Sequence, residues 1–259
     1  MRPGWKPSLP KKRVRLALFF SFAFLLFYHS EYEVPILMYH HVGAASEASG
    51  PTVSAETFER QMEFLKLHRY RVMRLEEIAE RLKSGRPLPP NAVAITFDDG
   101  TVDNFDEAFP ILKKMDFPAT IFVITNNINK KGSLSEEDLR ILDEAGVAIG
   151  SHTESHAFLP GLTRREAVWE LAGSKKRLEA ILGHPVRLFS YPAGGTDETI
   201  KALVRAQGYA AAVTTNYGNK RHDPYALHRI KIGESKGSLF NFWIKLSGLY
   251  QLGKKRISQ

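Results

Sequence analysis

The sequence predicts an α/β fold in which a mostly parallel sheet closes into a single barrel. Short apolar runs alternate with amphipathic segments along the chain, which is typical of repeated strand–helix units. About seven such units fit within roughly 200 residues without a linker, which favours one barrel over an open sheet. Polar residues follow three of the strand ends, at His40, Asp98 and His152, and Pro192 follows a fourth. Barrel enzymes carry their chemistry on that face.

The expected strands are short apolar runs, and buried parallel strands have this character. The clearest is 92–97, which ends directly before two adjacent carboxylates. In chain order the expected strands are 34–39, 71–73, 92–97, 119–123, 147–151, 186–191 and 209–214.

Start and stop signals mark the helices between these strands. Ser54 and Ser135 can each cap a first turn, and Thr163 with Glu166 forms a capping box. Gly183 is suited to end the helix that the capping box begins. In chain order the expected helices are 54–67, 75–83, 104–115, 135–145, 163–182 and 197–207.

Charge is concentrated at the two ends of the chain. The formal net charge is +8, but residues 2–15 carry six Lys or Arg and residues 254–256 carry three more. These nine charges exceed the net charge, so the middle of the chain is close to neutral (8 − 9 = −1). We therefore expect no nucleic-acid partner. The sequence has no Cys, which excludes disulfides and thiolate chemistry.

The amino-terminal residues have the pattern of an export signal. A basic segment, 1–15, leads into the apolar segment 16–30. The apolar run is short for a membrane span, which favours a cleaved signal peptide, but no small-residue cleavage pattern follows it, which favours an uncleaved membrane anchor. The uncleaved anchor is the favoured interpretation, and it places the barrel domain, 31–235, outside the cytoplasmic membrane in the cell envelope.

The tail, residues 236–259, is aromatic, weakly amphipathic and ends in basic residues. It could form a helix that lies on the membrane surface. The favoured alternative is a helix that packs against the barrel.

Two motifs carry the candidate chemistry. Asp98 and Asp99 follow one strand, and His152 and His156 follow another about fifty residues later. Two imidazoles four residues apart in one turn can converge on a single ion, and one carboxylate completes a set of three ligands. Adjacent residues of a strand point in opposite directions, so the second carboxylate is left to accept a proton. This arrangement suits metal-assisted hydrolysis.

With a third motif at 189–194, these residues resemble the polysaccharide deacetylase family, also called the NodB homology domain. The resemblance spans roughly residues 34–232 and implies a distorted (β/α)7-type barrel. It implies that Asp98 is the catalytic base. It also implies that Asp99, His152 and His156 bind a divalent ion, Zn²⁺ before Co²⁺ or Ni²⁺. The third motif is expected to line the substrate groove through Tyr191, Pro192 and Gly194, with the backbone N–H of Tyr191 binding the oxyanion.

Some positions depart from the family pattern. Many members have an arginine at the position of Ser190 that steadies the catalytic base, and Arg187 lies three residues earlier. The late motif that carries the family's usual general acid is poorly matched by Leu227-His228. Residues 34–42 instead resemble the opening strand of the exopolysaccharide-deacetylase branch, in which His40 would be the general acid. His40 could also be a structural histidine.

The function expected from the resemblance is hydrolysis of N-acetyl groups from a polysaccharide that contains N-acetylglucosamine, with release of acetate. An O-acetyl esterase acting on a cell-wall polymer could share the site. A catalytically inactive glycan-binding barrel is the alternative from another functional class.

Overall fold

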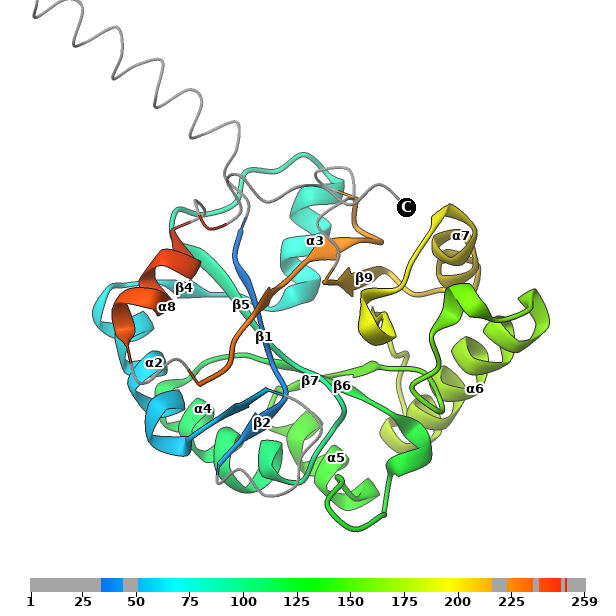
Figure 1. Cartoon of the computed structure of the whole chain (residues 1–259), viewed down its shortest axis with the longest axis horizontal. Helices are drawn as coiled ribbons and strands as arrows, with labels where there is room; N and C mark the ends of the chain where they lie inside the picture. Colours follow the sequence, from blue (N-terminus) through cyan, green and yellow to red (C-terminus); the bar gives the residue numbers. More distant parts are fainter. Residues whose placement is uncertain (1–33, 44–50, 216–222, 235–237, 248–249, 251–259) are drawn as a thin grey trace, which may run out of the picture. The chain divides into compact units, whose positions relative to one another are not determined.

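The protein is described from a computed structural model, in which residues 34–43, 51–215, 223–234, 238–247 and 250 are described. The chain divides into two units, Met1–Glu33 and Val34–Gln259. The first lies outside the described residues, and with it the basic and apolar segments 1–15 and 16–30. The second unit holds a sheet of parallel strands with helices around it (Figure 1).

The strands of the main sheet are short and, apart from the two-residue members, almost entirely buried. They are β1 (Ile36–Tyr39), β4 (Arg71–Val72), β5 (Ala92–Phe97), β6 (Thr120–Val123), β7 (Ala148–Ser151), β8 (Leu188–Ser190), β9 (Ala211–Thr214), β10 (Leu227–His228) and β11 (Ile230–Lys231). A separate pair is formed by β2 (His41–Val42) and β3 (Thr52–Val53).

The strand order makes the sheet a nearly closed barrel. Its path runs β10-β9-β8-β7-β6-β5-β1-β11, and every pair along it is parallel. The two end strands, β10 and β11, are separated in sequence only by Arg229. One short segment, residues 227–231, therefore passes from the first strand of the path to the last and occupies the seam of the barrel.

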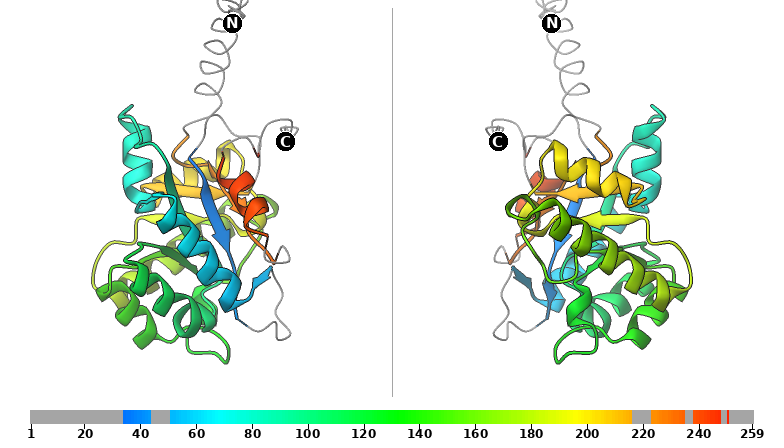
Figure 2. Two further views of the ribbon diagram at one scale, coloured as in Figure 1. Left: turned by 90° about the vertical axis from the view of Figure 1, so that its left-hand side faces the viewer. Right: turned by 90° about the vertical axis from the view of Figure 1, so that its right-hand side faces the viewer.

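Helices follow most strands and cover the outside of the sheet (Figures 1 and 2). They are α2 (Ala55–Leu67), α3 (Leu75–Lys83), α4 (Phe109–Met115), α5 (Glu136–Glu144), α6 (Arg164–Leu182), α7 (Glu198–Ala206) and α8 (Leu239–Leu246). Their expected caps are present: the Ser54 side chain accepts from the Thr57 N–H, and Ser135 and Thr163 each form a capping box. Residues Asn104–Ala108 form a π-helical turn that continues into α4.

Alternate residues of the strands feed two hydrophobic clusters. On β1, Leu37 and Tyr39 pack with the outer helices, whereas Ile36 belongs to a second cluster with Phe122 and Leu188. This second cluster also takes in buried residues of α3. Burial of alternate side chains on opposite faces of a strand explains why continuous apolar runs were readable as barrel strands.

The tail is only partly described. Its helix α8 packs on α2, and the ring of Phe242 meets Phe64 edge-on with centroids 5.9 Å apart. Phe240 and Trp243 remain exposed on the other side of the helix. The expectation of packing against the barrel is met by one face of α8. Residues 251–259, including the basic triplet, lie outside the described residues. No helix within the described ranges is long and apolar enough to cross a membrane.

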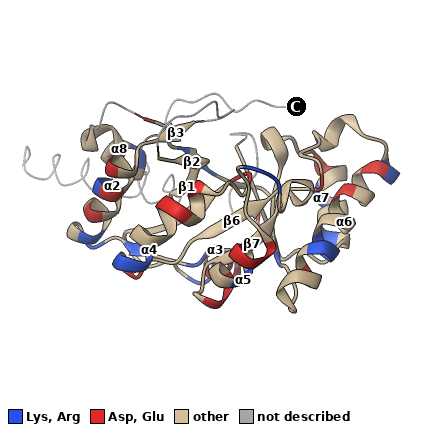
Figure 3. Cartoon of the chain, turned by 90° about the horizontal axis from the view of Figure 1, so that it is seen from below, with Lys and Arg blue, Asp and Glu red and all other residues tan. Residues whose placement is uncertain are grey.

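Charges of both signs are distributed over the outer helices. In Figure 3, Lys and Arg lie among Asp and Glu on α2, α5, α6 and α7, whereas the only charged residues of α4 are lysines. Such interspersion is typical of a solvated helical surface.

Candidate active site

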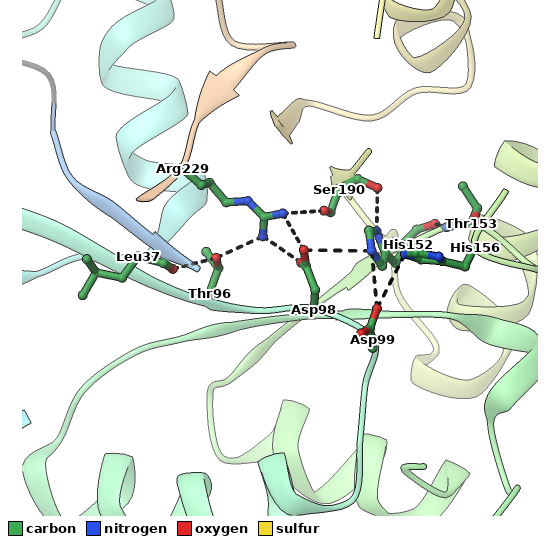
Figure 4. Close-up of polar contacts among 10 residues, drawn as sticks. Leu37, Thr96, Asp98, Asp99, His152, Thr153, His156, Ser190 and Arg229 are labelled. Carbon is green, nitrogen blue, oxygen red and sulfur yellow. Dashed lines mark hydrogen bonds and ion pairs between the residues drawn. The ribbon is translucent and has the colours of Figure 1, made fainter. Parts of the chain in front are cut away.

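Asp98 lies at the carboxyl end of β5 and is almost fully buried. Its two carboxylate oxygens face the guanidinium of Arg229, with Nη1 donating to Oδ1 at 2.7 Å and Nη2 donating to Oδ2 at 2.5 Å (Figure 4). The Ser190 hydroxyl accepts from Nη2 at 2.9 Å. This two-pronged geometry orients the carboxylate and holds it as an anion.

Arg229 is the functional candidate that the sequence reasoning missed. Arg187, the arginine nearest to Ser190 in sequence, is exposed, whereas Arg229 is 2% exposed and sits at the barrel seam. The signal that could have identified it is a lone cation between the apolar residues Leu227 and Ile230. A buried arginine is rarely left without an acidic partner. Arg229 stands within the segment that was compared with the family's late motif, and its pairing with Asp98 is a reason for the poor match of residues 227–229 to that motif.

The residue after Asp98 leaves the strand in the left-handed region. Asp99 has φ of 75° and the following Gly100 has φ of 69°. This turn directs the Asp99 carboxylate away from Arg229 and toward the histidines (Figure 4). The two adjacent carboxylates therefore have different main partners, and their two different roles stay a prediction.

His152 and His156 lie on the loop after β7. The two imidazole rings have centroids 4.8 Å apart. Nδ1 of His152 is 2.8 Å from the carbonyl oxygen of Ser190, and because a carbonyl only accepts, Nδ1 must carry the hydrogen. The lone pair of His152 is then on Nε2, which faces Asp99. A hydrogen bond that fixes the tautomer in this way is usual for metal-binding histidines.

The ligand atoms of Asp99, His152 and His156 lie within 4.8 Å of one another. Asp99 Oδ1 is 3.6 Å from His152 Nε2 and 3.7 Å from His156 Nε2. Two atoms bound to one Zn²⁺ at about 2.0–2.2 Å lie roughly 3–3.6 Å apart in a tetrahedral site. Two imidazole nitrogens and one carboxylate oxygen at these separations fit a small divalent ion with little movement. His156 and Asp99 are partly exposed, so solvent and substrate can reach the site.

His40 follows β1, next to Asp98. The β1–β5 register pairs Tyr39 with Phe97, and the backbone N–H of Asp98 donates to the Tyr39 carbonyl. Within the described part of the chain, Nδ1 of His40 is buried without a hydrogen-bond partner. The Asn104 side chain donates to the His40 backbone carbonyl at 2.8 Å. The next residue, His41, is paired with Asp103 at 2.8 Å.

Burial shifts the pKa values of the buried groups. It lowers the pKa of His40 to about 4, and Arg229 adds to this effect while Asp98 opposes it. It lowers the pKa of His152 to about 4 as well. Burial would raise the pKa of Asp98, but the charge of Arg229 outweighs it and holds that pKa well below its ordinary value. Burial and the neighbouring Asp98 raise the pKa of Asp99.

The third motif forms a tight turn after β8, and its details correct one expectation. The Tyr191 N–H donates to the Val213 carbonyl at 3.1 Å, so it belongs to the sheet ladder and is not available to an oxyanion. Tyr191, Pro192 and Gly194 are all buried, whereas Ala193 is exposed, with φ of 52°. The three expected residues shape the turn, and Ala193 is the one that faces out.

Comparisons with known proteins agree on one family. The family model for polysaccharide deacetylases matches residues 85–212. The chain is 36% identical over 217 residues to YxkH of Bacillus subtilis (strain 168), which is assigned to the polysaccharide deacetylases, covering 82% of this chain and 76% of that protein. It is 30% identical over 177 residues to the poly-β-1,6-N-acetyl-D-glucosamine N-deacetylase of Staphylococcus epidermidis, covering 62% of this chain and 61% of that protein. Among solved structures, the Streptococcus pyogenes deacetylase PplD in complex with acetate superposes with a TM-score of 0.76 at 27% identity, covering 82% of this chain and 97% of that chain.

Proposed function

Because the chain belongs to the polysaccharide deacetylase family, we propose that it removes N-acetyl groups from a polymer of β-linked N-acetylglucosamine in a metal-dependent reaction. The observation that carries the proposal is that the adjacent carboxylates of Asp98 and Asp99 contact different partners. One carboxylate is held by Arg229 and the other faces two histidines. The similarity to a poly-N-acetylglucosamine deacetylase supports the choice of polymer.

Asp99, His152 and His156 would hold the ion, most suitably Zn²⁺. When bound there, a divalent ion polarises the acetyl carbonyl and makes water more acidic. Asp98 lies next to this site, with Oδ2 3.9 Å from His152 Nε2. Its anionic carboxylate accepts the proton that water loses as it attacks the acetyl carbon. Arg229 keeps that carboxylate charged and fixes its direction.

The oxyanion that forms on the acetyl group needs a hydrogen-bond donor, and we assign this role to the N–H of Ala193. In the turn of residues 191–195, Pro192 has no N–H, and the N–H groups of Tyr191, Gly194 and Gly195 donate to backbone carbonyls. The Ala193 N–H is therefore the remaining donor of that turn within the described residues. Donors placed at a developing oxyanion are worth about 3–4 kcal/mol.

The leaving amine must be protonated, and His40 is the proposed acid. Its pKa of about 4 makes it neutral at pH 7 before substrate binds. His40 must therefore receive a proton during the reaction before it can deliver one. Asp98 lies beside His40 and can supply the proton that it has taken from water. His40 would pass that proton on to the amine nitrogen as the C–N bond breaks.

The deciding experiment measures acetate released from a pentamer of β-1,6-linked N-acetylglucosamine. We expect release by the zinc-loaded protein, none after chelation, and recovery when Zn²⁺ is restored. Asp98→Asn should bind Zn²⁺ normally and lose about 10²–10⁴-fold in turnover, the range of a general base. Release from O-acetylated polymer alone would identify an esterase, and zinc-independent or absent release from both would refute the proposal.

A further inference from the structure

Phe158 is an exposed aromatic residue beside the candidate active site. It lies two residues after His156, on the loop between β7 and α6, and is 49% exposed. Two residues span at most about 7 Å of chain, so its backbone is close to a proposed metal ligand. The next residue, Leu159, is fully buried and anchors the loop in the core. The loop therefore does not need the Phe158 side chain for its packing.

One glycine, Gly195, makes room for this ring, and a second, Gly161, lies at ordinary contact distance from it. A Cβ atom added to Gly195 would lie 2.2 Å from Cε2 and 2.6 Å from Cδ2 of Phe158, so one edge of the ring rests on bare backbone. A Cβ atom added to Gly161 would lie 3.8 Å from Cδ1. Any larger residue at position 195 would displace the ring. The ring is thus held in place on one side while about half of its surface stays open to solvent.

The ring bridges the two segments that carry the proposed chemistry. Its own loop follows β7 and carries His152 and His156. Gly195 follows β8 and lies two residues after Ala193, the proposed oxyanion donor. Strands β7 and β8 are neighbours in the sheet. Because the carboxyl ends of parallel neighbours share one edge of the barrel, the ring stands on the same rim as the reacting centre.

We propose that Phe158 is a sugar-stacking platform that binds the pyranose next to the one that loses its acetyl group. This role rests on the proposed function. The face of a β-linked N-acetylglucosamine ring is lined with C–H groups, which are suited to the electron-rich face of an aromatic ring. An isolated exposed aromatic would need no explanation, but this one is seated at the rim between two segments of the site. Contacts beyond the reacting sugar position a polymer for reaction.

The test compares a long substrate with one that has no neighbouring sugar. Phe158→Ala is assayed in the zinc-loaded protein on the β-1,6-linked N-acetylglucosamine pentamer and on 4-nitrophenyl acetate. We expect kcat/KM on the pentamer to fall on the order of ten-fold, mainly through KM. Ester hydrolysis and the Kd for Zn²⁺ should not change. Phe158→Trp should restore the pentamer rate, because an indole ring offers the same flat surface.

Phe240→Ala is the matched control, because Phe240 is 65% exposed on α8, outside the strand ends that carry the site. It should leave all rates unchanged. Equal losses on pentamer and ester, or weaker zinc binding in Phe158→Ala, would overturn the stacking role and show that the side chain supports the loop. An active wild type with an unaffected Phe158→Ala would also overturn it. A wild type that releases no acetate from the pentamer would instead overturn the proposed function, and this role with it.

Discussion

The Asp98–Arg229 pair is the most buried charged contact among the described residues of the site, with the two side chains 5% and 0% exposed. Burying two charges costs solvation energy, and the cost is recovered only when the geometry and the additional hydrogen bonds are good. Here both carboxylate oxygens are paired, and the guanidinium also donates to Ser190 and to Thr96. The ion pair therefore orients the Asp98 carboxylate and keeps it ionised, and this role is at least as important as its contribution to the stability of the fold.

Replacing Arg229 tests this interpretation. Arg229→Met leaves a buried carboxylate without its partner, and we expect the free energy of unfolding to fall by about 3–5 kcal/mol. Arg229→Lys keeps the charge but loses the fork that binds two oxygens. It should fold and bind Zn²⁺, because Arg229 does not contact the three proposed ligands, yet lose at least roughly ten-fold in kcat. Arg187→Ala is the control and should be close to wild type. Wild-type kcat in Arg229→Lys would contradict the positioning role.

His40 predicts a dependence of stability on pH in the metal-free protein. Its ordinary pKa of 6.5 applies to the unfolded chain, whereas burial lowers the pKa to about 4 in the folded protein. Between these values the unfolded chain binds a proton that the folded protein does not. The free energy of unfolding should therefore fall as pH falls from about 6.5 to about 4. Chemical denaturation across this range should show a smaller fall for His40→Gln. Some fall should remain, because the pKa of His152 is also about 4. Identical slopes would show that the His40 environment has been misread.

The sequence indicates those residues of the candidate site that directly follow a recognisable strand. Asp98, Asp99 and His152 directly follow apolar runs that are strands, so the ends of those runs place them at one rim. Arg229 escapes this reasoning because its partner is 131 residues away. Tyr191 shows a second limit. The motif predicts a turn at residues 189–194. Only the backbone hydrogen bonds of the structure show that the Tyr191 N–H is already bonded within the sheet, which leaves the Ala193 N–H as the donor for an oxyanion.

At the scale of elements, helix α6 holds the loop that carries both histidines. The buried Glu170 carboxylate accepts from the backbone N–H groups of Glu154 and Ser155, each at 2.9 Å, and from the Ser155 hydroxyl at 2.5 Å. One turn further along the helix, Gly173 leaves room for Glu154, whose Oε1 lies 2.0 Å from where a Cβ atom would be. His156 has φ of 63°, so this loop must be held in an unusual conformation.

Glu170→Gln should therefore weaken metal binding without unfolding the barrel. The amide has one accepting oxygen in place of two, and its NH₂ group cannot accept from the loop. We expect the Kd for Zn²⁺ to rise roughly 10–100-fold, as for other residues that orient metal ligands. Competition with a chromophoric chelator measures this value, and thermal unfolding of the metal-free protein controls for stability. Glu144→Gln, on an exposed position of α5, is the matched control. An unchanged Kd in Glu170→Gln would limit Glu170 to a structural role.

The seam of the barrel explains why the fold was easier to predict than its closure. Strands of four to six residues, such as β5 and β6, have readable apolar runs. The strands β10 and β11 have two residues each, and no periodicity can be read from two residues. Their backbone pairing with β9 and β1 is what brings Arg229 to Asp98. The sequence analysis did not identify Arg229 for the same reason that it did not identify β10 and β11, since all three belong to one short segment.

At the scale of the whole molecule, the remaining question is the cellular location of the barrel domain. Residues 16–28 are apolar except for Ser21 and follow six positive charges, but they lie outside the described residues. We propose that they tether the enzyme to the cytoplasmic membrane with the barrel on the outer side. The basic triplet 254–256 offers a second, electrostatic contact. Salt distinguishes the two, because exposed charges are screened within about 3 Å at 1 M salt while a buried apolar segment is not affected.

The full chain should therefore sediment with membranes and resist a 1 M salt wash, a condition chosen from the screening length. A chain that begins at Glu31 should become soluble after the same wash, because only the basic tail could then hold it. Both forms should release acetate from the pentamer at equal rates, since the proposed catalytic residues lie in the barrel. A mature amino terminus near residue 31 in exported protein would show a cleaved signal peptide in place of an anchor. Retention of the shortened chain after the salt wash would assign the membrane contact to α8 and its exposed Phe240 and Trp243 instead.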